Sequence, residues 1–338
     1  MPRRVRRRRQ RKQPHTLHVF LTIVLVLLTV CVLVKAFFLK APEQKAAELP
    51  AQSAASDTDS QQSPEEQAAQ EALRSHLERK GGFYTILVSG VDDDNGGSDT
   101  NILMAVDTVN GYVYGVSIPR DSKAIIGGKA HKINYAYNKG GTALLASTVS
   151  EQLGIPVDYT VCVNLQGFTA LVDAIGGVDF EVPINMDYDD PIQGLSIHFK
   201  KGMQHLSGAD ALRVVRFRHN NDGTGYGSED LGRMQTQQKF LKAVAKKMLS
   251  FENLISNPRK YAEIFGQYVD TDLSVTDLAW FGMQVLGMGV DKIDFSTLPN
   301  EWKYPYIYLD PDETLALVNT YLNPYVEDRT AEDLNLPG

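Results

Sequence analysis

The sequence predicts an α/β domain, a three-layer α-β-α sandwich with a mixed central sheet, behind one N-terminal transmembrane helix. Apolar strand patterns alternate with helical patterns from residue 83 onward, which favours a sheet covered by helices. An Asn-Gly hairpin signal lies among these strands and adds antiparallel pairing to the sheet. A basic arm followed by an unbroken apolar run predicts the membrane helix.

Composition indicates a globular protein with two differently charged parts. The 338 residues are 43% apolar and 22% charged, enough to bury a full core. The net charge of −7 conceals a basic N-terminus, because residues 1–40 hold ten Lys and Arg and no acid. The rest is strongly acidic, which argues against nucleic acid as a partner of the globular part.

The N-terminus reads as an uncleaved signal anchor. Residues 1–16 form a basic tail, and Leu17 to Leu39 is an apolar run long enough to cross a bilayer. The run is longer than the apolar region of a signal peptide and no small-residue cleavage site follows it closely. By the positive-inside rule the tail is cytoplasmic, so we expect a single-pass cell-membrane protein with an extracytoplasmic domain.

Cys31 in the span and Cys162 beyond it cannot pair, which predicts a domain without disulfides.

Residues 40–80 are rich in Ala, Gln, Ser and acidic residues and predict a polar stalk with a helical piece near its end. The stalk would let the domain reach away from the membrane. Order is expected from Phe83, where FYTILVSGV predicts a strand with apolar residues on both faces. Strands over Asn101–Thr108 and Tyr112–Pro119 follow, joined across Asn110-Gly111.

The later pattern continues the alternation of helix and strand. We expect helices over Thr142–Leu153, Gln166–Ile175 and Asp230–Leu249, another helix after an N-cap at Ser207, strands over Asp158–Leu165 and from Val178, and a loop over residues 186–202. Residues 251–338 predict aromatic helices and one strand, DKIDFSTLP, as an extension of the domain at residues 81–250. The pattern does not decide whether this extension packs or forms a docking surface.

Charged residues gather where the first three strands end or begin. Asp92 follows the first strand and Asp99 begins the second, so both carboxylates are expected at the carboxyl edge of the sheet. Two carboxylates and substrate phosphate suit Mg²⁺, although a solvated loop with Asp99 as a cap explains the same residues. Arg120 after the third strand is expected at that edge, with Asp121 either orienting it or acting as a turn acid.

Three arginines lie in the stretch VVRFRHNNDGTGYGSEDLGRMQTQQ. If its start is extended, Arg216 and Arg218 lie on one face, while Arg233 and Gln237 share a helical stripe. Guanidinium groups at this density suit an anion with several oxygens. The alternative is that they pair with nearby acids and hold a loop in place; those acids are Asp210, Asp222, Glu229 and Asp230. No nucleophile elbow, Walker loop or metalloprotease motif competes with this site.

An ordered set of strings carries a family resemblance. GVDDDNGGSDTNILMAVD, SIPRDS, HKINYAYNKGG, GF-x-x-LVDAIGGVDFEVP, FKKGMQHLSGADALRVVRFR and DLGRMQTQQ follow one another in this order behind a signal anchor. Over about residues 83–249 the chain resembles the LytR-CpsA-Psr family of bacterial cell-wall assembly proteins. The resemblance implies transfer of a glycopolymer, of wall teichoic acid or capsule type, from a polyprenyl-pyrophosphate carrier onto peptidoglycan through a phosphodiester link.

The resemblance also implies roles for single residues. Asp92 and Asp99 match the family's aspartates that bind Mg²⁺ or Mn²⁺. Arg120, Arg216 and Arg218 match its pyrophosphate-binding arginines, and Arg233 and Gln237 fall in its Gly-Arg…Gln-Gln helix. The chain departs from the family at Gly97 and Thr236, where arginine is frequent. The lipid tail is expected between the sheet and its helices, where Phe168, Leu171 and Val172 either line a slot or belong to the core.

Three functions remain open from the sequence. The first is an Mg²⁺-dependent phosphotransferase in which the arginines stabilise the pyrophosphate and a wall sugar hydroxyl is the nucleophile, with Asp121 as a candidate base. The second is a non-catalytic module that binds lipid-linked glycans or regulates assembly, motivated by the two missing arginines. The third is hydrolysis of the polyprenyl pyrophosphate by the same residues.

Overall fold

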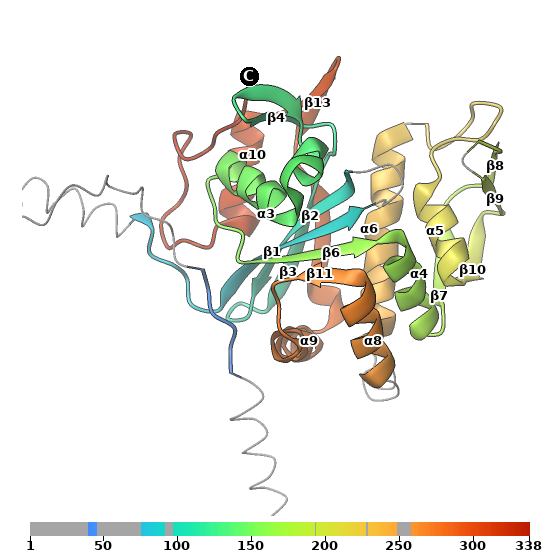
Figure 1. Ribbon diagram of the computed structural model, residues 1–338, viewed down its shortest axis with the longest axis horizontal. Helices are drawn as coiled ribbons and strands as arrows, with labels where there is room; N and C mark the ends of the chain where they lie inside the picture. The colour runs from blue at the N-terminus through green and yellow to red at the C-terminus, as the bar shows by residue number, and fades with distance from the viewer. Residues whose placement is uncertain (1–39, 46–75, 92–96, 193, 228, 249–257) are drawn as a thin grey trace, which may run out of the picture. The chain divides into compact units, whose positions relative to one another are not determined.

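A computed structural model describes residues 40–45, 76–91, 97–192, 194–227, 229–248 and 258–338 (Figure 1). The chain divides into two compact units, residues 1–42 and 43–338. The predicted span at Leu17–Leu39 and the predicted metal ligand Asp92 lie outside the described residues. Within the described residues, no helix combines the length and the apolar character that crossing a membrane requires.

A six-stranded mixed sheet forms the centre of the second unit, in the order β11-β6-β1-β2-β3-β12. Its strands are β1 (Phe83–Val91), β2 (Ser98–Asp107), β3 (Tyr112–Ile118), β6 (Tyr159–Asn164), β11 (Val269–Thr271) and β12 (Ile293–Thr297). The β1–β2 and β2–β3 pairs are antiparallel, whereas β6 is parallel to β1 and β12 is parallel to β3. The carboxyl ends of β1, β3, β6 and β12 therefore share one edge with the start of β2.

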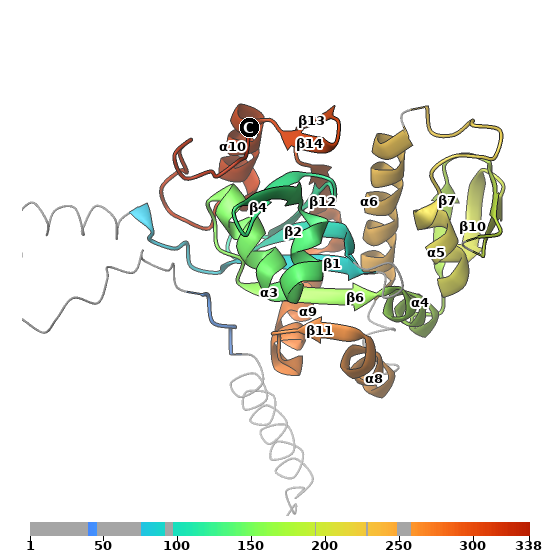
Figure 2. The same cartoon turned by 45° about the horizontal axis from the view of Figure 1, so that its top comes forward.

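Helices cover both faces of this sheet, which confirms the predicted three-layer sandwich (Figures 1 and 2). The helices are α3 (Asn134–Leu153), α4 (Leu165–Ala174), α5 (Gly208–Arg216), α6 (Glu229–Met248), α8 (Pro258–Tyr268), α9 (Val275–Met288) and α10 (Pro311–Leu317). α3, α10 and a π-helical turn at Val318–Leu322 contribute side chains to the core on one face. α6 and α9 contact the other face.

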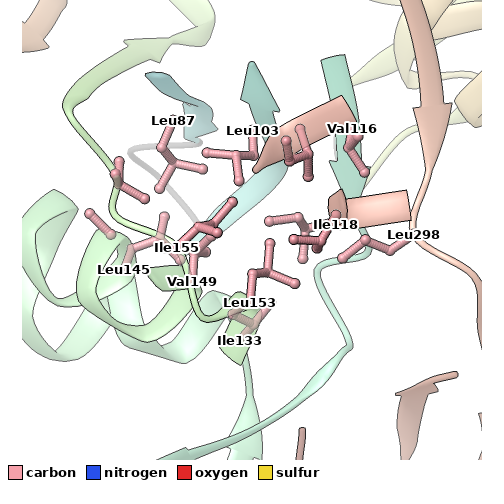
Figure 3. Close-up of a cluster of buried hydrophobic side chains, with 14 of the residues drawn as sticks. Leu87, Leu103, Val116, Ile118, Ile133, Leu145, Val149, Leu153, Ile155 and Leu298 are labelled. Carbon is pink, nitrogen blue, oxygen red and sulfur yellow. The ribbon is translucent and has the colours of Figure 1, made fainter. Parts of the chain in front are cut away.

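The main core lies between the sheet and α3 (Figure 3). Leu87, Leu103 and Val116 project from neighbouring strands toward Leu145 and Val149 of α3, and all five are at most 1% exposed. Alternate residues of a strand share a face, so a single apolar row from each strand supplies this layer. Burying a side chain of this kind contributes about 1.5–3 kcal/mol.

Glycines set the ends of two predicted elements. α3 is interrupted at Gly140 and Gly141, so the helix predicted from Thr142 is the part that follows the break. Gly154 ends α3 in the left-handed region at φ 64°, so the helix stops at Leu153, the predicted last residue. The Asn110-Gly111 hairpin is also confirmed, and Asp107 accepts hydrogen bonds from the backbone N–H of Val109 and Asn110 within the turn.

A second core packs α4, α5 and α6 against two small two-stranded sheets. Their strands are β7 (Val178–Val182), β8 (Met186–Asp190), β9 (Leu195–Phe199) and β10 (Gly202–Leu206). β7 pairs with β10 rather than joining the central sheet. The predicted loop over residues 186–202 is wrong, because Met186 and Ile197 bury alternate positions of a β8–β9 hairpin whose exposed positions are largely polar.

The C-terminal region packs into the same domain. It supplies β11 and β12, which are the two edge strands of the central sheet. It also carries a separate hairpin of β13 (Asn300–Lys303) and β14 (Tyr306–Leu309), which lies beside the hairpin of β4 (Lys123–Ile126) and β5 (Lys129–Lys132). These four short strands were not predicted. Buried Cys162 on β6 is a free thiol, as expected.

A buried ion pair fixes the point where the chain enters the domain. Asp158, which is fully buried, accepts hydrogen bonds from both terminal nitrogens of Arg79 at 2.9 and 2.8 Å. It also accepts from the backbone N–H of Lys45 at 3.0 Å and of Thr85 at 2.9 Å. Gln44 donates to the carbonyl of Phe83 at 2.6 Å. Residues 44 and 45 of the predicted stalk are therefore attached to the domain itself.

Replacing Asp158 with Ala is expected to lower the free energy of unfolding by about 3–5 kcal/mol, because the mostly buried guanidinium of Arg79 loses its counter-charge. Urea denaturation measures the change. Asp179→Ala, which removes an exposed partner of His205, is the matched control and should have little effect. Equal stability of the Asp158 variant and the control would contradict the central role of this pair.

Candidate functional site

Asp99 and Arg120 meet at the carboxyl edge of the sheet, as predicted. Asp99 begins β2 and Arg120 follows β3, and the antiparallel register pairs Asn101 with Ile118 nearby. Arg120 Nη1 donates a hydrogen bond to Asp99 Oδ1, and both side chains are partly exposed. Asp92 directly follows Val91 but lies outside the described residues. The structure thus joins one predicted carboxylate and one predicted arginine in a single accessible site.

Asp121 interacts more closely with a lysine than with Arg120. Its Oδ1 lies 2.8 Å from Nζ of Lys132, whereas its Oδ2 is 4.0 Å from Nε of Arg120. The predicted orienting role is therefore weak in this geometry. Sequence reasoning missed Lys132, because its position on the short strand β5 gives no spacing signal. Lys132 adds another positive charge near Arg120.

Gly97, one of the two departures from the family pattern, has a backbone that favours glycine. Its φ of 88° lies in the left-handed region, where other residues are strained. A side chain there would contact the amide groups of Asn134 and Asn138 at 3.5–3.6 Å. These two asparagines lie four residues apart on α3, a spacing that places them on one stripe. They are neutral polar groups beside a position where the family frequently has a charge.

Arg216 and Arg218 flank a buried aromatic residue. α5 continues to Arg216, so the condition of an extended backbone, on which a common face for Arg216 and Arg218 depended, is not met at residues 214–216; Val214 is buried as part of the helix. Phe217 then adopts an extended conformation at φ −62°, ψ 135° and is fully buried. The two arginines precede and follow this anchor, and Arg218 is exposed.

The described acidic residues near these arginines are engaged elsewhere. Asp210 pairs with Arg213 at 2.8 Å, and Asp222 accepts hydrogen bonds from Thr224, which lower the pKa of Asp222. Among the residues whose side chains are described, Arg216 and Arg218 form no ion pair; the side chains of Glu229 and Asp230 fall outside that set. The alternative in which Asp210 and Asp222 hold the arginines as loop staples is therefore not supported.

Aromatic packing connects this segment to Arg233. The rings of Phe217 and Tyr226 form an edge-to-face pair with centroids 5.6 Å apart. Tyr226 packs directly on Gly232, where a Cβ would overlap the Tyr226 side chain. Burial raises the pKa of the Tyr226 phenol, and the positive charge of Arg233 opposes part of that rise. Arg233 directly follows Gly232 on α6, so this packing fixes the helix start that carries Arg233 beside Phe217.

Two glutamines of α6 hold the helix to both halves of the site. Gln237 Nε2 donates to the carbonyl of Val215 near the end of α5 at 3.0 Å. Gln238 Nε2 donates to the carbonyl of Ser296 on β12 at 2.9 Å. Gln237, predicted to bind substrate, therefore uses its amide nitrogen to position α5. Sequence reasoning missed the role of Gln238, although the Gln-Gln pair drew attention to it.

Thr236, the second departure from the family pattern, faces the second core. It is 3% exposed and its hydroxyl donates to the carbonyl of Gly232 at 2.9 Å. The same side of α6 carries buried Phe240 and Val244, which continue the stripe at four-residue intervals. The position therefore contributes packing rather than charge.

The α6 and α9 face of the sheet is less tightly covered than the α3 face. Apolar side chains near its middle are only partly buried; they are Val88, Met104, Val161 and Val163. Val172, in contrast, is fully buried in the second core, and Phe168 packs against Phe240. These two are core residues, and the partly buried valines and Met104 are better placed to meet an apolar ligand.

A metal would have to be held by few protein ligands. Among the described residues, no three His, Cys, Asp or Glu side chains converge on a possible metal position. Asp99 Oδ1 is engaged by Arg120, and Oδ2 accepts no hydrogen bond from the described residues. One carboxylate oxygen of this kind, with Asp92 and water, fits Mg²⁺, which commonly uses one or two carboxylates and substrate phosphate.

Gly232→Ala is expected to displace Tyr226 and, with it, Phe217 and its flanking arginines. We expect a loss of about 1–3 kcal/mol in the free energy of unfolding, together with weaker binding of inorganic pyrophosphate in isothermal titration calorimetry. Gly266→Ala is the control, because no atom lies within 4 Å of a Cβ at that helical position. Unchanged pyrophosphate binding in Gly232→Ala would contradict the proposed coupling.

Comparison with known proteins identifies the family of the chain. The family model for LytR-CpsA-Psr proteins matches residues 47–322. The chain is 32% identical over 241 residues to the polyisoprenyl-teichoic acid–peptidoglycan teichoic acid transferase TagV of Bacillus subtilis, covering 68% of this chain and 59% of TagV. It is 39% identical over 177 residues to TagU of Bacillus cereus, covering 51% of this chain and 55% of TagU. The chain thus spans less than two thirds of these relatives.

Other matches extend over more of the chain. The regulatory protein MsrR of Staphylococcus aureus is 32% identical over 257 residues, covering 75% of this chain and 76% of MsrR. The crystal structure of B. subtilis TagV superposes with a TM-score of 0.60 at 30% identity, covering 71% of this chain and 96% of that structure. The family model over residues 47–322, together with these relatives, shows that the chain belongs to the LytR-CpsA-Psr family.

Proposed function

We propose that this domain transfers a glycopolymer from a polyprenyl-pyrophosphate carrier to peptidoglycan and leaves a phosphodiester link. The names of TagV and TagU describe them as polyisoprenyl-teichoic acid–peptidoglycan teichoic acid transferases. A solved TagT structure, described as bound to LI-WTA, has a TM-score of 0.56 at 25% identity over 70% of this chain and 88% of that structure. These relatives support the proposal, and the residues of this chain supply its mechanism.

The observation that carries the proposal is a set of arginines without described acidic partners in an acidic domain. Residues 41–338 contain 24 of the 34 basic residues and all 41 acidic residues, so acidic partners for an arginine are plentiful. Arg216 and Arg218 nevertheless form no ion pair with described side chains, while Arg213 on the same helix does. Unpaired guanidinium groups favour an anionic ligand, and a pyrophosphate offers the bidentate oxygens they bind.

The proposed transfer is a displacement at phosphorus, in which one P–O bond forms and one P–O bond breaks. A hydroxyl oxygen of the acceptor sugar bonds to the phosphorus that carries the glycopolymer, and the bond from that phosphorus to the bridging oxygen breaks. Polyprenyl monophosphate leaves with the bridging oxygen, and the hydroxyl proton passes to a base or to water. Arg120, Arg216, Arg218 and Arg233 would neutralise the oxygens during this exchange, which is mainly positioning and electrostatics.

A divalent cation is part of this proposal. Asp99 and Asp92 would hold Mg²⁺, which supplies further charge neutralisation to the pyrophosphate when it is bound. Mn²⁺ would suit the same oxygen donors. Arg120 would meanwhile orient Asp99 through their hydrogen bond.

The partly buried apolar residues of the α6 and α9 face would accept the lipid. Val88, Met104 and Val161 lie near the middle of the sheet on the side that faces these helices. Removing apolar surface from water favours binding of a polyprenyl chain there. A lipid carrier and a peptidoglycan acceptor agree with the predicted single-pass anchor, a cytoplasmic N-terminus and an extracytoplasmic domain.

A second candidate is a module that binds the lipid-linked glycan without turnover. Gly97 and buried Thr236 favour it, because neither position supplies the positive charge that the family resemblance leads us to expect there. Incubation with lipid-linked glycan, with and without peptidoglycan fragments, separates the functions. Transfer requires the acceptor, hydrolysis of the pyrophosphate does not, and binding alone yields neither product.

Arg218→Ala is expected to reduce transfer about 10²–10³-fold, the usual cost of losing one group that stabilises transition-state charge. Polyprenyl phosphate or pyrophosphate that co-purifies with the native protein should be absent from the variant by mass spectrometry. Arg213→Ala is the matched control, because Arg213 lies five residues before Arg218, on α5, but pairs with Asp210. Loss of lipid and activity in both variants would argue against a specific role for Arg218.

Asp99→Asn is expected to weaken Mg²⁺ binding more than tenfold in the presence of pyrophosphate, since it removes one charged oxygen ligand. Titration of Mg²⁺ against thermal stability measures the effect without requiring turnover. Asp121→Asn keeps a similar location near Arg120 and serves as the control. If the two variants respond equally to Mg²⁺, Asp99 is not a metal ligand.

A further inference from the structure

Trp302 and Tyr304 are the two most exposed aromatic side chains in the described part of the chain, at 55% and 89% exposure. Trp302 lies on β13 and Tyr304 lies in the turn before β14. Large aromatic surfaces left in water forgo the stabilisation that burial provides. Two of them at one hairpin tip indicate a ligand that covers them.

The hairpin is attached directly to the edge that carries Arg120. Ile307 of β14 donates its N–H to the carbonyl of Asp121 at 2.9 Å and forms a parallel bridge with Ser122. Trp302 is the partner of Ile307 across the hairpin. Two strand spacings therefore separate Trp302 from the backbone next to Arg120, a distance of about 10 Å. A short run of sugar rings spans such a gap.

Contacts on the opposite side fix the hairpin in place. The ring of Tyr308 has Nζ of Lys123 at 4.9 Å and Nζ of Lys303 at 5.8 Å from its centroid, within the range of cation–π attraction. Tyr306 donates its hydroxyl to the carbonyl of Ala130 at 3.2 Å. The exposed aromatics are thus presented on an anchored support.

We propose that Trp302 and Tyr304 form a platform that binds the glycan strand of the acceptor. The faces of aromatic rings are electron-rich and attract the polarised C–H groups on the flat side of a pyranose. Glu301 and Lys303 alternate with Trp302 along β13 and pair with each other on the opposite face, which leaves the face of Trp302 to the ligand. The platform rests on the proposed transferase function, because it holds the acceptor whose hydroxyl attacks beside Arg120.

The position of the hairpin favours a glycan over a lipid surface. β13 lies on the opposite side of the domain from residues 43–45, where the chain arrives from the predicted anchor (Figures 1 and 2). A protein held at a membrane through that segment directs the hairpin away from the bilayer. The charged pair of Glu301 and Lys303, 2.7 Å apart, would also oppose insertion into lipid.

Tryptophan fluorescence of the full chain in detergent tests the platform, because the sequence has two tryptophans and Trp280 is only 7% exposed. The probe is soluble, uncrosslinked peptidoglycan strands freed of attached polymer. Bound strands should protect Trp302 from acrylamide quenching. Tyr304→Ala should require about three- to tenfold more strand for the same protection. Met203→Ala, which removes an equally accessible apolar side chain on β10, should behave like the native protein.

A second measurement does not depend on fluorescence. Trp302→Ala should sediment less with insoluble, polymer-free peptidoglycan than the native protein, while its binding of pyrophosphate is unchanged. Protection of Trp302 by phosphatidylglycerol vesicles but not by glycan strands overturns the proposal, and so does native-like glycan binding by both variants. Glycan binding that depends on the two aromatics, in a protein that shows no transfer, supports the platform and refutes the transferase function separately.

Discussion

Two adjacent amides on α6 hold the site together. Gln237 reaches the last turn of α5, where Arg216 and Arg218 follow, and Gln238 reaches β12 beside the end of β3. Neighbouring residues on a helix point about 100° apart, so one short stretch can contact two different elements. Each amide satisfies a backbone carbonyl that would otherwise be costly to bury. The distance between the α5 arginines and the sheet edge therefore depends on this one helix.

The direction of the strands determines which residues meet at that edge. β1 and β3 run the same way because each is antiparallel to β2, and β12 extends the set as a parallel neighbour of β3. Arg120, Asp99 and the end of β1 at Val91 consequently share one edge of the sheet. α6 reaches the same side through a contact between Met234 and Thr297 at 3.8 Å. Residues more than a hundred positions apart are thus brought to a common surface by topology rather than by local motifs.

The sequence predicted the parts of the fold that depend on long apolar patterns. β1, β2, β3, β6 and the main helices appear near their expected bounds, because buried rows and glycine ends are local signals. The β8–β9 hairpin escaped prediction because Asp187, Asp189 and Asp190 dominate its composition. Burial of alternate residues against α5 outweighs their weak strand propensity.

The site was predictable to a similar extent. The ion pair of Asp99 and Arg120 follows from strand order, which hairpin signals reveal. The backbone conformation around Arg216 could not be predicted from the sequence. Val214 and Val215 suit a strand and a helix alike, and only their packing in the second core decides between the two. Lys132, Gln238 and the hairpin with Trp302 depend on tertiary contacts between short elements. No spacing in the sequence specifies such contacts.

The attachment of residues 43–45 changes how the polar segment after them can act. Tyr159 donates its hydroxyl to the carbonyl of Glu43 at 2.6 Å, and Lys45 pairs with Asp272 at 3.2 Å. Lys45 and His76, the described residues on either side of residues 46–75, both contact the domain, so the distance from the domain to the predicted span does not depend on the length of that segment. If the predicted span ends at Leu39, three residues, Lys40 to Pro42, connect it to Glu43, which is at most about 14 Å of chain. A donor held in the membrane by its lipid tail and a domain held this closely to the same membrane would meet without a long excursion by either.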